Sequence, residues 1–171
     1  SIVTHDSGSP RDQMIPFYQS AQPRSYLGWG KSHALGTGLG FAMGAKLAAP
    51  EKVCINWMGD AAFGMTGLDF ETAVRCQIPI ITIVSNNSTM AIETSRMMES
   101  QERYGTRDLG GNYADLARAL GGWAERVTDP GLIHETLKRA RRVTEEQGLP
   151  ALVEVITSSE TERSTQTGNV G

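Results

Sequence analysis

Cysteine is scarce in this sequence of 171 residues, which holds only Cys54 and Cys76 and no CxxC pair. That scarcity excludes a disulfide scaffold and favours reduced thiols in a cytoplasmic protein. An excess of positive charge is also lacking, because 16 lysines and arginines stand against 19 aspartates and glutamates, for a net charge of −3. Without a positive field, nucleic acid is not an expected partner.

Long apolar runs are missing as well. None approaches the roughly 20 residues that cross a bilayer, and the first residues, SIVTHDSGSP, lack the charged-then-apolar order of a secretory signal. We therefore expect no membrane partner. With 39% hydrophobic and 20% charged residues, the composition suits one globular domain. We expect that domain at residues 1–157 and a mobile polar tail at 158–171. Because the chain enters an apolar segment directly after Ser1, we expect a piece of a longer polypeptide.

Apolar runs of strand length alternate with helix-period segments along the chain. Strands are predicted at 2–5, 53–58, 80–85, 123–127 and 151–157, and helices at 36–49, 68–76, 113–120 and 130–147, with a short one after Pro10. This alternation is typical of βαβ units, so the predicted fold class is α/β, with three layers and a doubly wound, mainly parallel sheet. The run IPIITIVS at 78–85 is apolar on both faces, which predicts a central strand.

The helix at 130–147 has clear end signals: Asp129 as its cap, Pro130 in its first turn and Gly148 after its end. Four basic residues lie along it. These residues are Lys138, Arg139, Arg141 and Arg142. We interpret them as a solvated face of the helix and not as a binding site for an anion.

Two short segments at the ends of neighbouring predicted strands carry residues suited to chemistry, MGDAA at 58–62 and SNNST at 85–89. Ligands of doubly wound sheets bind outside the carboxyl ends of the strands. Asn87 follows Asp60 by 27 positions, enough for a loop, a helix and a strand that return the chain to the same edge. Alone, Asp60 would be a helix cap and the asparagine pair a turn. Together they predict a site.

The donor atoms of these segments indicate the kind of ligand. A carboxylate, a carboxamide and main-chain carbonyls are hard oxygen ligands, which suit Mg²⁺ or Ca²⁺ better than zinc or iron. Because Mg²⁺ keeps part of its shell for phosphate and water, a phosphorylated ligand is expected. The small residues Gly59, Ala61 and Ala62 would let main-chain amides approach that phosphate.

The segment GDAAFGMTGLDFETAVRCQIPIITIVSNN at 59–87 resembles the thiamin-diphosphate motif, in which Gly-Asp is followed, after a helix and a strand, by Asn-Asn. It is most similar to the diphosphate-binding, carboxyl-terminal domain of the acetolactate synthase large-subunit family. The similarity continues upstream through THDSGSPRDQM and HALGTGLGFAMGAKLAAPEK, and downstream through NYADLARALGGWAERV and LPALVEV. Nearly the whole chain to about Val155 is covered.

This resemblance implies that Mg²⁺ is held by the side chains of Asp60 and Asn87 and by the main-chain carbonyl of Thr89. The other cofactor-binding positions that it implies are Ser7, Gly8 and Ser9, Gly59, Ala61 and Ala62, and Leu35 and Met90. It also implies a thiamin-diphosphate carboligase or decarboxylase, of transferase or lyase type, that acts on a 2-oxo acid such as pyruvate. The expected partner is a pyrimidine-binding domain or subunit, in a homo- or hetero-oligomer.

Four residues depart from the family pattern; Leu35 bears on the geometry of the cofactor, and the other three limit the assignment of substrate. Leu35 replaces a residue that is often methionine, and Arg96 stands where acetolactate synthases commonly have a tryptophan near the substrate entrance. Arg11, in a longer turn after the first loop, could reach a phosphate or a neighbouring chain, or be a surface arginine. His33 replaces a common glycine, and a turn histidine is favoured over one that faces substrate.

The family's activating glutamate lies in a separate amino-terminal domain. None of five glutamates of this chain has a context that resembles it: Glu51, Glu71, Glu93, Glu99 and Glu102. We therefore assign no acid-base residue here. Two alternatives stay open, a non-catalytic relative and a dinucleotide-binding module. The second fits poorly, since the sixth position of a GxGxxG pattern would be Phe41 or Met43.

Overall fold

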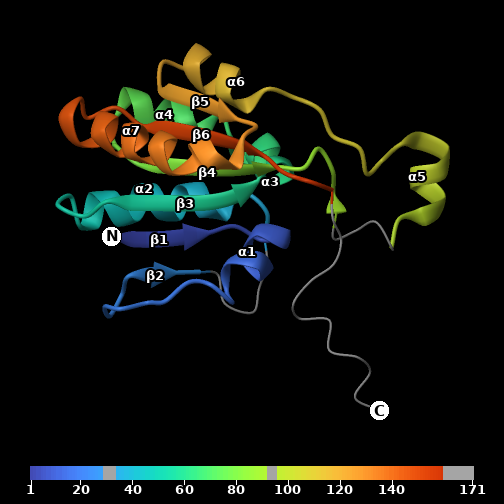
Figure 1. The fold of residues 1–171 in the computed structure, drawn as a ribbon, viewed down its shortest axis with the longest axis horizontal. Helices are drawn as coiled ribbons and strands as arrows, with labels where there is room; N and C mark the ends of the chain where they lie inside the picture. The colour runs from blue at the N-terminus through green and yellow to red at the C-terminus, as the bar shows by residue number, and fades with distance from the viewer. Residues whose placement is uncertain (29–33, 92–95, 160–171) are drawn as a thin grey trace.

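A computed structural model describes residues 1–28, 34–91 and 96–159 of the chain. Their strands form one six-stranded sheet in the order β2-β1-β3-β4-β6-β5, and every neighbouring pair is parallel (Figure 1). The strands are β1 (Ile2–His5), β2 (Tyr26–Leu27), β3 (Cys54–Gly59), β4 (Ile81–Asn86), β5 (Trp123–Val127) and β6 (Ala151–Ile156). The predicted α/β class with a parallel sheet is confirmed.

Helices cover both faces of this sheet (Figure 1). They are α1 (Ser9–Met14), α2 (Thr37–Ala48), α3 (Asp60–Thr66), α4 (Asp69–Arg75), α5 (Met98–Tyr104), α6 (Tyr113–Ala119) and α7 (Ile133–Glu146), with a 3-10 turn η2 (Pro130–Leu132). The larger core cluster joins α2, α3, α4 and α6 to the sheet through residues such as Leu39, Phe63 and Phe70. On the other face, Ala140 of α7 packs against Ile81 and Val153. The layers are therefore helix, sheet, helix.

Strand β4 lies between β3 and β6, so the prediction that the apolar run at 78–85 forms a central strand is confirmed. Three elements were not predicted. β2 is only two residues long, and α5 buries none of its residues, so neither carries a clear apolar period. α3 starts at Asp60, before the helix predicted at 68–76, and it was missed because Gly59, Gly64 and Gly67 lower the helical signal of this stretch.

The predicted helix at 130–147 begins later than expected, because η2 forms first and Asp129 caps it through the N–H of Gly131 at 2.8 Å. The interpretation of the basic residues of α7 as a solvated face is confirmed. Each of the four has a carboxylate partner: Lys138 pairs with Glu135, Arg139 with Glu125, Arg141 with Glu145 and Arg142 with Glu146.

Within the three described ranges, no helix has both the length and the apolar character to cross a membrane. The predicted boundary at 157 and tail at 158–171 stay predictions, since residues 160–171, like His33, lie outside the described residues. What the fold does provide is an edge of the sheet at which the carboxyl ends of β1, β3 and β4 lie side by side (Figure 1).

Candidate functional site

A cavity of about 450 Å³ lies at this carboxyl edge of the sheet. Its walls come from the segments that follow β1, β3, β4 and β6, from Leu35 two positions before α2, and from Arg96 two positions before α5. All eleven residues that the sequence assigned to cofactor binding line it: Ser7, Gly8, Ser9, Leu35, Gly59, Asp60, Ala61, Ala62, Asn87, Thr89 and Met90. Residues spread over more than eighty positions of the chain are thus brought together by parallel strands.

Asp60 is the first residue of α3 and is only 3% exposed. Its Oδ1 accepts the N–H of Ala61 at 3.0 Å. Its Oδ2 is buried and has no hydrogen-bond partner in the described part of the chain. Burial raises the pKa of this carboxyl, against the opposing peptide N–H groups of Ala61, Ser88 and Thr89. The carboxylate therefore lies beside the turn that follows β4.

That turn, residues 86–90, is held by asparagine side chains and by a second segment. Asn87 Oδ1 accepts the N–H of Thr89 at 3.1 Å. Residues 107–109 run antiparallel to it, with the N–H of Met90 donating to the Arg107 carbonyl at 2.9 Å and the N–H of Leu109 to the Ser88 carbonyl at 2.9 Å. The carbonyl oxygen of Thr89 takes no part in this pairing. Asn87 and Thr89 are thus fixed beside Asp60 and line the same cavity.

The opposite wall is organised by Asp6, a residue that the sequence analysis did not single out. Its buried carboxylate accepts the N–H groups of Ser7 at 2.8 Å, Gly36 at 2.8 Å and Gly38 at 2.9 Å. These bonds tie the end of β1 to the start of α2 and so place Leu35 beside Gly8. The usable signal was an aspartate directly after a strand and before a Ser-Gly pair.

Arginines 11 and 96 also line the cavity. Arg11 lies in α1 and pairs with Asp12, its Nε donating to Asp12 Oδ1 at 2.8 Å. Its guanidinium is therefore neither isolated nor on the outer surface, since the side chain is 21% exposed. The only carboxylates among the described lining residues are Asp12 and Asp60, so no glutamate there reaches the cavity.

A second depression, of about 460 Å³, lies at the amino ends of the strands. Two lysines line it, Lys46 and Lys52. The ammonium group of Lys46 already donates to the carbonyls of Pro50 and Lys52, each at 2.8 Å. The buried carboxylate and the asparagine turn are at the opposite edge. We therefore place the candidate site at the carboxyl edge, as expected for a parallel sheet.

In the glycine-rich segment at 36–44, Gly36 and Gly38 are closely packed, whereas a Cβ on Gly40 or Gly44 would meet nothing within 4 Å. A Cβ on Gly38 would lie 2.4 Å from Asn56 Oδ1 and 3.0 Å from the carbonyl of His5, so this glycine lets α2 approach β1 and β3 closely. A dinucleotide loop has one glycine for such packing but needs another that lets the backbone approach the pyrophosphate, and no glycine of this segment lines the cavity. The dinucleotide alternative therefore has no support from this geometry.

The residues present fit a bound divalent cation. A buried carboxylate oxygen without a partner is costly, and a cation beside Asp60 Oδ2 would offset that cost. The described residues contain no group of three or more His, Cys, Asp and Glu side chains that could hold a metal. A cation here would therefore need neutral oxygens, as Asn87 and Thr89 provide, and oxygens of its own ligand.

Comparison with known proteins agrees with this geometry. Residues 6–155 match the family model described as thiamine pyrophosphate enzyme, C-terminal TPP binding domain, thiamine pyrophosphate being another name for thiamin diphosphate. The acetolactate synthase large subunit IlvG of Mycobacterium tuberculosis (strain ATCC 25618 / H37Rv) is 35% identical over 163 residues, which cover 91% of this chain and 28% of that protein.

Two further relatives extend the comparison. The mitochondrial acetolactate synthase of Schizosaccharomyces pombe is 32% identical over 158 residues, 90% of this chain and 23% of its own length. The 2-hydroxyacyl-CoA lyase of Saccharomyces cerevisiae is 42% identical over 87 residues, 51% of this chain and 15% of its own length. The chain thus spans less than a third of the length of the curated relatives that it matches. With nearly its whole length matched by the family model and by the two acetolactate synthases, the chain belongs to the thiamin-diphosphate enzymes, as their C-terminal, cofactor-binding domain.

Proposed function

We propose that the cavity at the carboxyl edge holds thiamin diphosphate through Mg²⁺. The metal ligands from this chain are the carboxylate of Asp60, the side-chain oxygen of Asn87 and the main-chain carbonyl of Thr89. One observation carries the proposal: the buried Asp60 Oδ2, which has no hydrogen-bond partner among the residues that the structure describes, lies beside the turn that contains the other two groups. The fit of hard oxygen donors to Mg²⁺ supports it.

The diphosphate would lie between two loops that contain small residues. Ser7, Gly8 and Ser9 follow β1, and Gly8 has φ of +101°, a backbone conformation that favours glycine. Across the cavity, Gly59, Ala61 and Ala62 leave room for an anionic group near the peptide N–H groups at the start of α3. Leu35 and Met90 would support the rest of the cofactor from opposite walls.

We further propose that the complete protein is a carboligase or decarboxylase acting on a 2-oxo acid such as pyruvate, in the manner of acetolactate synthases. When bound, thiamin diphosphate supplies the carbon nucleophile and the electron sink for this chemistry. This chain's residues bind and orient the cofactor. The acid-base group that activates it would come from a pyrimidine-binding domain or subunit, since no described glutamate lines the cavity. Arg96, at the same cavity, is the candidate for selecting substrate or acceptor.

The proposal also includes the cellular compartment of this protein and its assembly into an oligomer. Both cysteines are free, Cys54 buried and Cys76 exposed, which supports a reducing compartment such as the cytoplasm. An oligomer is proposed because a cofactor held at this edge needs a second protein surface to cover its reactive end.

The test is calorimetric titration of thiamin diphosphate into the complete protein, with Mg²⁺ and with a chelator, followed by measurement of carbon dioxide released from pyruvate. We expect binding only with Mg²⁺, and turnover with at least one 2-oxo acid. Binding that is equally strong with the chelator would remove the metal assignment. Tight Mg²⁺-dependent binding without turnover of any 2-oxo acid would remove the proposed activity but keep the proposed site.

A further inference from the structure

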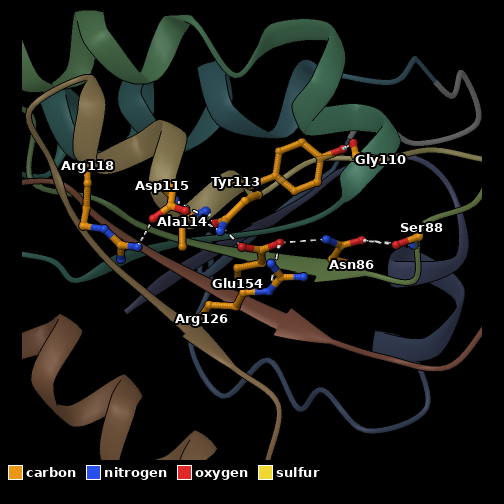
Figure 2. Close-up of polar contacts among 10 residues, drawn as sticks. Asn86, Ser88, Gly110, Tyr113, Ala114, Asp115, Arg118, Arg126 and Glu154 are labelled. Atoms are coloured by element: carbon orange, nitrogen blue, oxygen red, sulfur yellow. Dashed lines mark hydrogen bonds and ion pairs between the residues drawn. The ribbon is translucent and has the colours of Figure 1, made fainter.

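Glu154 is a fully buried carboxylate within strand β6, where it follows the buried Leu152 and Val153. It does not line the cavity. Its Oε1 accepts the side-chain N–H of Asn86 at 2.7 Å, and its Oε2 accepts the peptide N–H of Ala114 at 3.0 Å (Figure 2). Arg126 approaches Oε1 only to 3.9 Å, and its side chain is 40% exposed. A buried charge is costly, so its retention at this place requires a reason.

The bonds of Glu154 determine the orientation of Asn86. A carboxylate can only accept hydrogen bonds, so the amide of Asn86 must turn its nitrogen toward Glu154 and its oxygen the other way. That oxygen accepts the peptide N–H of Ser88 at 3.0 Å and the hydroxyl of Ser88 at 3.2 Å (Figure 2). With the opposite amide orientation, two acceptors would meet at Glu154, and the amide nitrogen would face the peptide N–H of Ser88.

Ser88 is the residue at which the turn needs such support. Its φ is +56°, a left-handed conformation that a non-glycine residue adopts only at a cost in free energy. Asn87 and Thr89 lie on either side of it and both line the cavity. The hydrogen bonds that Ser88 donates to Asn86 therefore hold the backbone that orients these two candidate metal ligands.

We propose that Glu154 is a positioning residue for the metal site: through Asn86 it holds the turn at 86–89 in the conformation that presents Asn87 and Thr89 to Mg²⁺. This inference rests on the proposed function for the identity of the ligand. It adds a carboxylate that touches neither metal nor cofactor, on a strand that contributes no proposed ligand.

Single substitutions should break this arrangement in two ways. In Glu154→Gln, the new amide can accept from Asn86 or from Ala114 but must turn its own N–H₂ group toward the other donor. In Asn86→Asp, two carboxylates face each other at the position of the present 2.7 Å hydrogen bond. The double variant exchanges the carboxylate and the amide between positions 154 and 86. Its new amide at position 154 donates to the new carboxylate at position 86 and accepts from Ala114, while that carboxylate still accepts from Ser88.

The experiment measures Mg²⁺ affinity at saturating thiamin diphosphate, by calorimetry on the complete protein, for the wild type, E154Q, N86D and the double variant. We expect each single variant to weaken Mg²⁺ binding by about 10- to 100-fold, as loss of groups that orient metal ligands typically does. The double variant should recover to within a few-fold of wild type. Val153→Ala is the matched control, because Val153 is equally buried in β6 but packs on the opposite face against α7.

A second measurement needs no ligand and no variant. Without metal, the wild-type protein should show slow hydrogen exchange at the peptide N–H groups of Ser88 and Ala114. The first donates to the side chain of Asn86 and the second to the side chain of Glu154. Fast exchange at both would overturn the proposal, and so would single variants that bind Mg²⁺ like wild type. A double variant as weak as the single ones would reduce Glu154 to a packing role. If wild type itself binds no Mg²⁺ with thiamin diphosphate, the proposed function fails instead, and the exchange result still shows whether the hydrogen bonds to Asn86 and Glu154 form without metal.

Discussion

Asp6 and Gly38 stand 32 positions apart, yet the peptide N–H of Gly38 donates to Asp6 Oδ2 at 2.9 Å. The carboxylate also accepts the peptide N–H groups of Gly36 and Ser7. These hydrogen bonds lower the pKa of Asp6, but burial raises it by more, so the pKa lies above its ordinary value. One side chain thus joins the end of β1 to the start of α2 on the wall opposite the proposed metal ligands. Its counterpart on the other wall is the pair of Glu154 and Asn86.

Replacing Asp6 by asparagine should lower the free energy of unfolding by about 1 to 3 kcal/mol, since an amide nitrogen would then face a buried peptide N–H. Chemical denaturation of the variant and the wild type measures this. Asp69→Asn is the control, because it removes the same charge from an exposed position at the start of α4. Equal losses in the two variants would show that charge alone, and not the three accepted bonds, matters at Asp6.

Two glycines should respond differently to alanine. At Gly59 an added Cβ would lie 3.5 Å from Pro10 Cγ, an ordinary contact, and φ is −87°. At Gly38 it would lie 2.4 Å from Asn56 Oδ1 and 3.0 Å from backbone atoms of His5. We expect Gly59→Ala to keep its stability and lose thiamin-diphosphate affinity, and Gly38→Ala to lose about 1 to 3 kcal/mol of stability through overpacking. Denaturation together with cofactor titration separates the two effects; undiminished cofactor affinity in Gly59→Ala would place the diphosphate elsewhere.

Asp60→Asn tests the proposed metal ligand with little change of shape. Because the carboxylate is the one charged group among the proposed ligands, its loss should weaken Mg²⁺ binding at saturating thiamin diphosphate by about 100-fold or more, roughly 3 kcal/mol. Stability without metal should not fall, since the substitution removes a buried charge whose Oδ2 has no partner among the described residues. Calorimetry gives the first quantity and denaturation in chelator the second. Unchanged Mg²⁺ affinity would rule Asp60 out as a ligand.

Glu125 and Arg139 should make stability depend on pH away from the site. Hydrogen bonding to Arg139, together with that to Thr136, lowers the pKa of Glu125 below its ordinary value of 4.5. Because the folded-state pKa is depressed, the contribution is present above the unfolded-state pKa and is lost as pH falls through the folded-state value. The pair is partly exposed, so its contribution should stay below about 1 kcal/mol. Urea denaturation of wild type and Glu125→Gln should differ near neutral pH and converge in acid, whereas a constant difference would mean that packing dominates.

How far the sequence leads can be judged at particular residues. Alternating apolar runs predicted five of the six described strands, because burial on two faces leaves a strong local pattern. Elements without such a pattern were missed, such as β2 with its two residues and the solvent-facing α5. The spacing of Asp60 and Asn87 predicted a shared edge, and both residues line one cavity. That they ligate Mg²⁺ stays a prediction.

The sequence by itself determined the fold class and predicted that Asp60 and Asn87 share one edge of the sheet, because strand period, helix ends and the Gly-Asp to Asn-Asn spacing can be followed along the chain. The other predicted cofactor-binding residues came from the resemblance to a family, and they line the same cavity. Only the tertiary structure decided how those residues are held. Glu154 carries no local signal, because its partner Asn86 lies 68 positions away. Asp6 has a local signal in its place directly after a strand, but that signal does not reveal its partner Gly38, 32 positions away. A buried carboxylate is read correctly only when the donors around it are known, and the packing of distant strands and helices sets those donors.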